Sequence, residues 1–475
     1  MNLETRTRLL QHLSELATDA GAAGDIKVFL PLARHRLALR PEVVVVQGER
    51  GAGKTAMFNL VQRHGSELRR LFDEPGIPDA TWLDAFSESR AHPAALVLDD
   101  LSAKHPQDTA LRAFWMAHLL GRLVDEGVQG AALPAPFAEL RALAPTDPGK
   151  WLAWAEQNPG ALMERLDAVD QQLAHTGQMV FATYDSLDRI GDLDRSHRQR
   201  LIRALLSLWL SLAARYGNLR AKVFLRHDLF EDAERSFADA SKLRPRSVSL
   251  SWDVESLFRL VVRHLANRGP AIEEAVEWLE AIRGLSLRPS KDLGLMPGEL
   301  PEPARRAFAT AVAGEIMGAG VKKGYTHRWI PDRLQDADGR IVPRSILRLL
   351  GEAARHALLA PMGKGRPLLK PIDLAAALIE TSRQRSNELA EEYLVVQRLE
   401  NLRGATMLLE RKDVARRLAR PVGAQDRLPE DGELVLEELR RIGVLEERRD
   451  GRIDVPDIYR YGYDIKRKGG VRRPR

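Results

Sequence analysis

The stretch VVVVQGERGAGKTAM, residues 43–57, constrains the fold of this chain more than any other feature. Residues 48–55 match the pattern G-x-x-x-x-G-K-[ST] in full. The valine run before it is typical of a strand buried on both faces of a parallel sheet. A helical pattern follows from Lys54 to about His64. A buried strand, a glycine-rich turn and a helix N-terminus in this order predict a phosphate-binding loop.

Each residue type in this loop has a chemical reason. Glycines let the backbone turn its N–H groups toward a phosphate, and the Lys54 ammonium reaches the outer phosphates of a nucleotide. The Thr55 hydroxyl is a ligand for Mg²⁺. The residues that we expect to contact the nucleotide are Gly48, Gly51, Ala52, Gly53, Lys54, Thr55 and Ala56.

Further strand candidates alternate with long helical patterns, which predicts an α/β fold built on a P-loop NTPase parallel sheet. These candidates are residues 81–86, 179–184, 221–225 and 248–250. Residues 285–303 are rich in Pro and Gly and are expected to form a linker or long loop. The expected domains are an N-terminal helical segment (1–40), a P-loop core (41–255) with a helical insertion (102–176), a helical lid (256–370) and a C-terminal helical or winged-helix domain (371–475).

A Mg²⁺ site at a phosphate-binding loop needs a second ligand, an acid at the end of a neighbouring apolar strand. Two segments compete for this position. One is LVLDD, with Asp99 and Asp100, but Pro93 just upstream of it indicates a helix start. The other is MVFATYDSLDRI, in which Asp185 and Asp188 follow an apolar strand. We favour the second.

Two arginines are candidates for reaching the terminal phosphate. Arg226 ends the strand KVFLR, and the alternative is an ion pair on the surface with Asp228. Arg344 begins an amphipathic helix with an apolar face. Its alternative is a solvent-facing arginine in a first helical turn. No arginine finger is identified, and for Arg244 and Arg246 we expect a surface role.

Over residues 25–360, these motifs together resemble the AAA+ and STAND branches of P-loop ATPases, including origin-recognition-type and NACHT-like switches. YDSLDRI resembles the STAND form of the Walker B motif, which implies that Asp185 binds Mg²⁺ and that Asp188 positions the attacking water. VFLRHD is similar to the segment carrying a sensor arginine, here Arg226. PRSILRLLGEAA resembles a lid helix with a second sensor arginine, here Arg344. The chain also looks like bacterial ATP-binding proteins with FLRHDLF and LSWD stretches, some of whose relatives are associated with phage defence.

The chain departs from this resemblance at one place. Most AAA+ enzymes carry glutamate directly after the Walker B aspartate, and here Ser186 stands there. Arg189 also replaces the last acid of the STAND motif. We therefore expect slow hydrolysis, which suits a nucleotide-gated switch better than a motor.

The C-terminal block predicts a helix followed by a hairpin, which is the layout of a winged helix. Apolar residues from Leu434 to Ile442 fit a helix that ends at Gly443, and Asp450-Gly451 indicates a tight turn. Winged helices bind DNA or dock proteins, and both alternatives stay open. The basic residues that could meet phosphates are Arg448 and Arg449 at the wing and Lys466, Arg467, Lys468, Arg472, Arg473 and Arg475 in the tail.

The composition indicates the cellular compartment in which we expect this chain. The chain has no cysteine, so it has no disulfide and no thiolate metal site, which suits a cytoplasmic protein. No signal peptide or membrane span is expected, since the most apolar helix, residues 204–214, is too short. The net charge is +6, and residues 460–475, with seven basic residues and one acid, carry all of that excess.

We therefore expect a Mg²⁺-dependent ATPase that works as a switch and couples its nucleotide state to a protein partner, with a role in bacterial defence and a nucleotide-dependent oligomer as extensions. The alternative is an initiator or loader that binds DNA under ATP control. A small-molecule kinase is disfavoured because such enzymes are usually much shorter. ATP rather than GTP follows from the resemblance, since no base-reading motif is visible.

Overall fold

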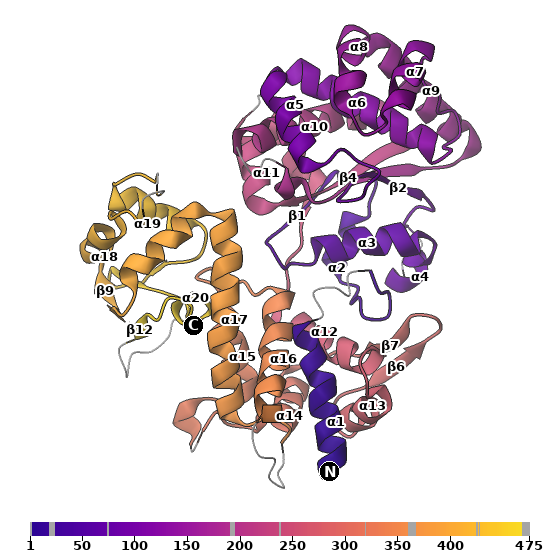
Figure 1. The fold of residues 1–475 in the computed structure, drawn as a ribbon. Helices are drawn as coiled ribbons and strands as arrows, with labels where there is room; N and C mark the ends of the chain where they lie inside the picture. Colours follow the sequence, from indigo (N-terminus) through magenta and orange to yellow (C-terminus); the bar gives the residue numbers. More distant parts are fainter. Residues whose placement is uncertain are drawn as a thin grey trace. The chain divides into compact units, whose positions relative to one another are not determined.

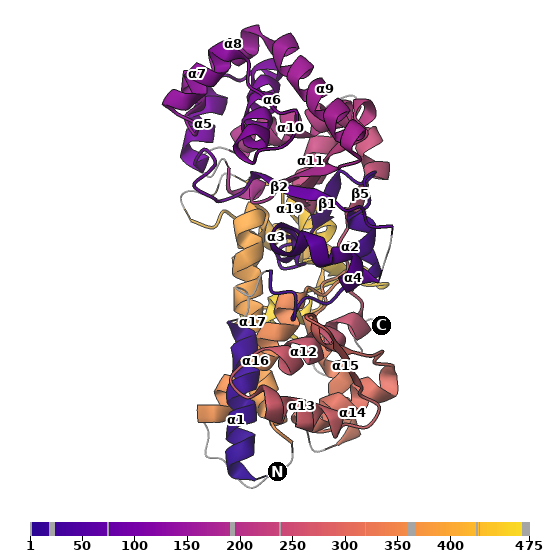
Figure 2. The ribbon, with the colours of Figure 1, turned by 90° about the vertical axis from the view of Figure 1, so that its right-hand side faces the viewer.

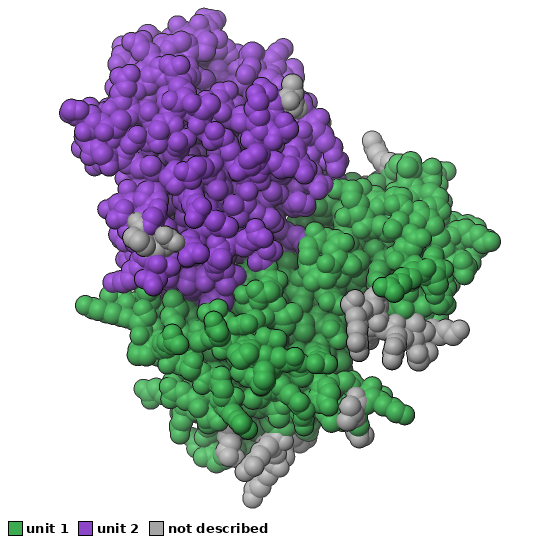
Figure 3. Space-filling model, turned by 180° about the vertical axis from the view of Figure 1, so that it is seen from behind, with its two compact units in different colours: residues 1–22, 252–475 green, residues 23–251 purple. Residues whose placement is uncertain are grey.

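The computed structural model describes residues 2–18, 24–73, 76–190, 195–236, 239–318, 320–359, 367–423, 426 and 428–467. The chain divides into two compact units (Figure 3). The sheet unit comprises residues 23–251, and the helical unit comprises residues 1–22 and 252–475.

The sheet unit is built on five parallel strands in the order β2-β3-β4-β1-β5. Every predicted strand is confirmed, and no strand end differs from its predicted position by more than two residues. The strand bounds are β1 Val45–Gly48, β2 Thr81–Phe86, β3 Val180–Tyr184, β4 Leu219–Arg226 and β5 Ser247–Ser249. All residues of β1 and β3 are buried, as the valine run predicted.

Helices cover both faces of this sheet (Figures 1 and 2). One face carries α2 (Ala33–Ala38), α3 (Lys54–His64) and α4 (Leu68–Phe72). The other face carries α10 and the predicted helical insertion, followed along the chain by α11. The bounds of these helices are α5 Ala95–Lys104, α6 Asp108–Asp125, α7 Ala135–Leu143, α8 Leu152–Gln157, α9 Pro159–Thr176, α10 Arg195–Arg215 and α11 His227–Glu234.

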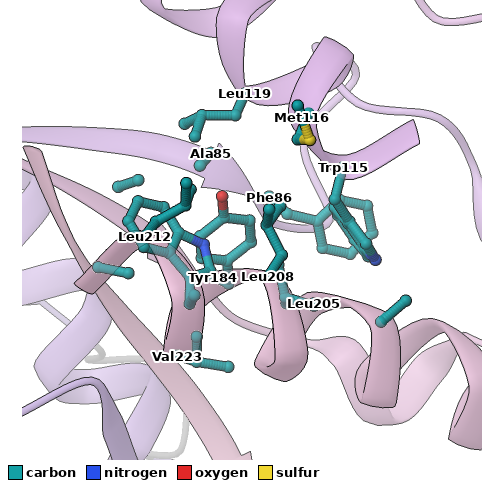
Figure 4. Close-up of a cluster of buried hydrophobic side chains, with 14 of the residues drawn as sticks. Ala85, Phe86, Trp115, Met116, Leu119, Tyr184, Leu205, Leu208, Leu212 and Val223 are labelled. Atoms are coloured by element: carbon teal, nitrogen blue, oxygen red, sulfur yellow. The ribbon is translucent and has the colours of Figure 1, made fainter. Parts of the chain in front are cut away.

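The insertion shares the core of the sheet unit. Trp115 of α6 and Tyr184 of β3 are fully buried and meet edge to face, with ring centroids 5.9 Å apart (Figure 4). The fully buried Trp209 of α10 meets Tyr184 in the same way, at 6.2 Å. The Trp115 indole N–H donates to the Leu201 carbonyl at 2.9 Å. Aromatic rings of this size dominate core energetics, so α6 is a structural part of the unit.

In the helical unit, α1 (Leu3–Ser14) packs on α16 (Pro343–Leu359) and on α13 (Ile272–Glu280). The predicted apolar face of α16 is confirmed, since Ile346, Leu347, Leu350 and Ala354 are buried. The remaining long helices are α12 Val254–Asn267, α14 Glu302–Ala313, α15 Thr326–Leu334 and α17 Pro371–Glu392.

The prediction of a linker or long loop at residues 285–303 was wrong. Strands β6 (Leu287–Ser290) and β7 (Gly294–Pro297) form an antiparallel hairpin there. The fully buried Arg263 guanidinium donates to the carbonyls of Leu293 and Leu295 at 2.7 and 2.8 Å. A buried cation needs such acceptors, and this long-range need is invisible in the local Pro and Gly content.

The predicted C-terminal helix and hairpin are confirmed. Helix α19 ends at Arg441 before Gly443, whose φ is 75°, and β10 pairs with β11 across the turn at Arg448 to Gly451. Strand β9 completes an antiparallel sheet in the order β10-β11-β9. The bounds in this region are η8 Leu394–Leu402, β8 Thr406–Met407, β9 Leu409–Glu410, α18 Arg411–Leu418, α19 Gly432–Arg441, β10 Glu446–Glu447, β11 Arg452–Asp454, α20 Asp457–Arg460 and β12 Lys466–Arg467.

The two ends of the predicted N-terminal segment, residues 1–40, lie in different units, because α1 belongs to the helical unit and α2 to the sheet unit. The predicted lid and C-terminal domain both lie in the helical unit, and the boundary between them stays a prediction. Within the described residues, no helix has the length and apolar character that crossing a membrane requires.

Candidate functional site

The glycine-rich loop joins β1 to α3 in the conformation that its glycines allow. Gly51 and Gly53 have φ of 84° and 103°, which side-chain-bearing residues rarely adopt. Gly53 is the N-cap of α3, and no side chain caps the first turn. The free N–H groups of a helix N-terminus attract anions. The strand, turn and helix start that the pattern predicted are therefore present, and phosphate binding by this loop stays a prediction.

Lys54 points back into this loop. Its ammonium donates to the carbonyls of Gly48 and Glu49 at 2.8 and 3.0 Å. Ala52 is buried, whereas Thr55 is exposed to solvent. The two side chains to which we give chemical roles, Lys54 and Thr55, thus occupy the mouth of the loop.

Strand β3 brings Asp185 to Thr55. The Thr55 hydroxyl faces the Asp185 carboxylate closely enough to lower its pKa. Asp185 is 4 % exposed, and its backbone N–H donates to the Phe86 carbonyl at 2.9 Å. The pKa of Asp185 is raised to about 6, mainly by burial and also by Asp188, while Thr55 and Lys54 oppose the shift. A carboxylate and a hydroxyl, 130 positions apart in the chain, therefore form one oxygen pair beside Lys54.

The rival acids Asp99 and Asp100 lie on helix α5, not at a strand end. Asp99 is buried and faces His197, with Oδ1 and Nδ1 3.4 Å apart. Asp100 is exposed and pairs with Lys104 at 2.6 Å. The helix start expected at Pro93 is observed, with α5 beginning at Ala95. The structure thus brings Asp185, rather than this pair, to the loop.

The residues after Asp185 form a tight turn. Ser186 has φ of 60°, which is strained for a residue with a side chain. Asp188 lies in the following 3₁₀ turn, Leu187–Arg189, and Arg189 pairs with Glu88 at 2.7 Å. Ser186 therefore occupies the position directly after Asp185, where the sequence showed its departure.

Arg226 ends β4 directly beside the loop, where it is the register partner of Gly48. Its guanidinium donates to Asp228 through Nε at 3.1 Å and Nη2 at 2.7 Å, and Nη1 lies 3.8 Å from Asp188. The expected alternative, a pair with Asp228, is therefore present, but Arg226 is 5 % exposed rather than on the surface. The guanidinium links Asp188 to the start of α11.

The remaining arginine candidates have partners elsewhere. Arg344 lies in the helical unit, in the first turn of α16, where it pairs with Glu388 at 3.4 Å. Its proposed contact with a nucleotide stays a prediction. Arg244 makes two hydrogen bonds to Glu234, which agrees with the expected surface role.

Sequence reasoning missed two contacts of this edge of the sheet. Nη1 of Arg198, on α10, donates to the Asp188 carbonyl at 2.8 Å. Gln47, just before the loop, and Nδ1 of His227 share a hydrogen bond of 2.7 Å. No local pattern marks these contacts, because each joins elements that are adjacent only in the folded sheet.

Some basic residues of the C-terminal hairpin and its neighbouring strand form ion pairs. Arg448 and Arg467 both pair with Asp454, at 2.7 and 2.6 Å, and Arg452 pairs with Asp450. Arg449 is exposed. The tail residues Lys468, Arg472, Arg473 and Arg475 lie outside the described residues.

Helix α18 carries exposed basic side chains beside this hairpin. They are Lys412, Arg416, Arg417 and Arg420, the last lying two residues past the helix end. Arg416 pairs with Asp413, whereas Lys412, Arg417 and Arg420 form no ion pair with any described residue.

The donor set fits a magnesium nucleotide. Mg²⁺ prefers oxygen ligands and usually takes only one or two protein groups, with waters and phosphates completing its shell. Thr55 and Asp185 supply two such oxygens. Across the described residues, no group of three or more His, Cys, Asp or Glu could hold a metal alone. A cation here therefore needs further ligands, and a phosphate held by the loop supplies them.

No protein-family model and no curated protein matches this chain. Solved structures that resemble it include the ORC1 protein of Aeropyrum pernix in complex with DNA, with 14% identity over 94% of this chain and 95% of that one, and a TM-score of 0.37. The ORC2 protein of the same organism, in ADPNP–ADP complexes, has 13% identity over 90% and 93%, with a TM-score of 0.30. A Walker-type ATPase of Pyrococcus abyssi has 13% identity over 90% and 93%, with a TM-score of 0.35. Similarity at this level assigns no role to any residue of this chain.

Proposed function

We propose that this chain is a Mg²⁺-dependent ATPase that works as a slow nucleotide-gated switch. The observation that supports the proposal is the position of Asp185, at the end of β3, beside Thr55 and Lys54 of the glycine-rich loop. A hydroxyl, a carboxylate and an ammonium in one neighbourhood are the groups that a magnesium triphosphate requires, which supports this proposal.

In this proposal, Lys54 leaves the two loop carbonyls that it now contacts and neutralises the outer phosphates. Thr55 and Asp185 hold the cation, which supplies charge stabilisation when it is bound. Asp188 orients the attacking water, whose oxygen forms the new bond to phosphorus while the bond to the bridging oxygen breaks. Arg226 compensates the charge that develops on the terminal phosphate. Slow turnover is expected because Ser186 offers no carboxylate beside Asp185.

The switch would act on a protein partner through the helical unit, with Arg344 contacting the nucleotide from α16. The proposal also includes a role in bacterial defence and a nucleotide-dependent oligomer, which rest only on the resemblance of the sequence motifs to AAA+ and STAND ATPases. Phosphate release from ATP and Mg²⁺ tests the activity, and Lys54→Ala is the control. Loss of release in the variant supports the proposal, whereas release that survives Lys54→Ala contradicts it.

A second function, DNA binding by the C-terminal part of the helical unit, is favoured by one observation. The unpaired basic side chains Lys412, Arg417 and Arg420 lie beside a helix and hairpin with the winged-helix layout. Exposed cations beside such a module suit phosphate contacts. Binding to double-stranded DNA would weaken steeply with salt, and neutral substitutions of these residues would flatten that slope. Binding unchanged in the triple variant would contradict this function.

A further inference from the structure

A cavity of about 400 Å³ opens between helices α10 and α11 of the sheet unit, and we call it the α10/α11 pocket. Its apolar floor includes Ile202 and Leu229. Three arginines, Arg200, Arg203 and Arg235, and one acid, Asp232, line it. The charged side chains of the lining therefore sum to +2, three positive charges against one negative.

Arg200 is the distinctive residue of the pocket. Its guanidinium donates to the Ser102 hydroxyl, the Ser196 hydroxyl and the Ser102 carbonyl, at 3.3, 3.3 and 3.1 Å. All of these acceptors are neutral, and Arg200 pairs with no carboxylate among the described residues. A half-buried guanidinium without a counter-ion attracts an anion, because charge-assisted hydrogen bonds are stronger than neutral ones.

The other two arginines are only partly neutralised. Arg203 pairs with Asp108 through Nη2, and its Nη1 forms no hydrogen bond with any described residue. Arg235 reaches Glu231 at 3.4 Å and is 64% exposed at the end of α11. An arginine has five N–H donors, so both side chains keep donors for a ligand.

The two walls of the pocket begin at the proposed nucleotide site. Arg198, in the first turn of α10, donates to the Asp188 carbonyl at 2.8 Å. Helix α11 begins directly after Arg226 and carries Asp228, the main partner of Arg226. A ligand that contacts both α10 and α11 would therefore shift the helix ends from which Arg198 and Asp228 hold Asp188 and Arg226.

We propose that the α10/α11 pocket binds an acidic side chain of a protein partner, and that this binding regulates the nucleotide site. Asp232 lines the same pocket and is held by Gln199 at 3.2 Å, so a singly charged carboxylate is favoured over a dianionic phosphate. The regulatory half of the inference rests on the proposed nucleotide function, whereas binding of the acidic side chain does not.

The test uses the full-length protein and a fluorescently labelled hexaglutamate peptide, with binding followed by anisotropy at low salt. We expect Arg200→Gln and Arg235→Gln each to weaken binding by about tenfold or more, because each removes a charged hydrogen-bond donor. Arg235 is exposed, so its variant keeps the test valid if Arg200→Gln disturbs folding. The matched control is Arg165→Gln, which changes an exposed arginine of α9 outside the pocket.

Peptide binding that is lost in both pocket variants and kept in Arg165→Gln supports the pocket. Binding that survives both variants overturns it, as does a pocket that takes inorganic phosphate but no peptide. The same titration in Lys54→Ala distinguishes a failure of the pocket from a failure of the nucleotide site. We expect Lys54→Ala to bind the peptide as the wild type does, because peptide binding by the pocket does not require a nucleotide. Regulation requires that a non-hydrolysable ATP analogue changes peptide affinity in the wild type but not in Lys54→Ala, and the peptide must change analogue affinity by the same factor. An analogue that binds without this coupling overturns the regulation.

Discussion

Arg226 and Asp228 form a two-bond ion pair at the end of β4, with the shorter bond 2.7 Å long. The pair is nearly buried, and the same guanidinium lies 3.8 Å from Asp188. A buried charge is rarely left without a partner. Asp228 therefore holds Arg226 beside the loop.

The first prediction concerns this arginine. We expect Arg226→Gln to lower ATP turnover by about a hundredfold, because it removes a donor to the charge that develops during the reaction. Single-turnover phosphate release measures the effect. Arg244→Gln, which breaks a surface pair with Glu234, should leave turnover unchanged. Equal turnover in wild type and Arg226→Gln would remove the sensor role from Arg226.

The second prediction concerns the left-handed glycine before Lys54. Gly53→Ala places a side chain at φ of 103° and should cost about 1–2 kcal/mol of stability, together with nucleotide binding. Gly177→Ala is the matched control, since Gly177 has φ of 66° and open space around its Cα. Both variants should show a similar fall in melting temperature, but only Gly53→Ala should lose binding of a fluorescent ATP analogue. Loss of binding in both would point to instability rather than to the loop.

The third prediction concerns the helical insertion. Trp115→Ala should destabilise the sheet unit by about 3–5 kcal/mol, because it empties a fully buried site and removes the bond to Leu201. Trp154→Ala, on α8, removes a half-buried ring and should cost less. Urea unfolding of the two variants measures the difference. Equal stability would show that the insertion does not share the core.

The helices and strands of this protein could be predicted from local sequence better than its long-range side-chain contacts could. The valine run at 43–46 and the apolar stretch at 179–184 predicted buried strands, and Pro93 placed LVLDD in a helix. The loop residues also followed from their pattern. Each of these features depends on neighbours in the chain.

Long-range partners could not be predicted in the same way. The ion pairs of Arg448 and Arg467 with Asp454 join side chains that meet only after folding. The hydrogen bonds from Arg263 to the hairpin carbonyls likewise join parts of the chain that meet only after folding. The residues that touch Asp188, such as Arg198, belong to the same class. Local composition indicates which secondary structure a segment prefers. The partners of a buried charge come from other parts of the chain, and they are known only once the fold is known.

The fourth prediction concerns stability below neutral pH. His35 is buried on α2, and burial lowers its pKa from 6.5 to about 4. The unfolded chain therefore binds a proton more readily than the folded chain between these pH values. The stability that neutral His35 contributes is complete above pH 6.5 and is lost as the pH falls toward about 4, by roughly 3 kcal/mol in all.

His35→Gln should flatten this part of the pH dependence relative to the wild type. Denaturant unfolding at several pH values between 4 and 6.5 measures the slope of each protein. Burial also lowers the pKa of His12 and His118, so some slope should remain in the variant. Identical slopes in the two proteins would show that His35 is not held neutral.

The most direct test of the nucleotide site compares its two rival acids. Equilibrium binding of a fluorescent ATP analogue, with Mg²⁺ and with a chelator, is measured for wild type, Asp185→Asn and Asp99→Asn. The account predicts Mg²⁺-dependent binding that Asp185→Asn weakens by about tenfold or more and that Asp99→Asn leaves intact, because only Asp185 shares the mouth of the loop with Thr55. Binding that ignores Mg²⁺, or that tolerates Asp185→Asn as well as Asp99→Asn, would contradict it.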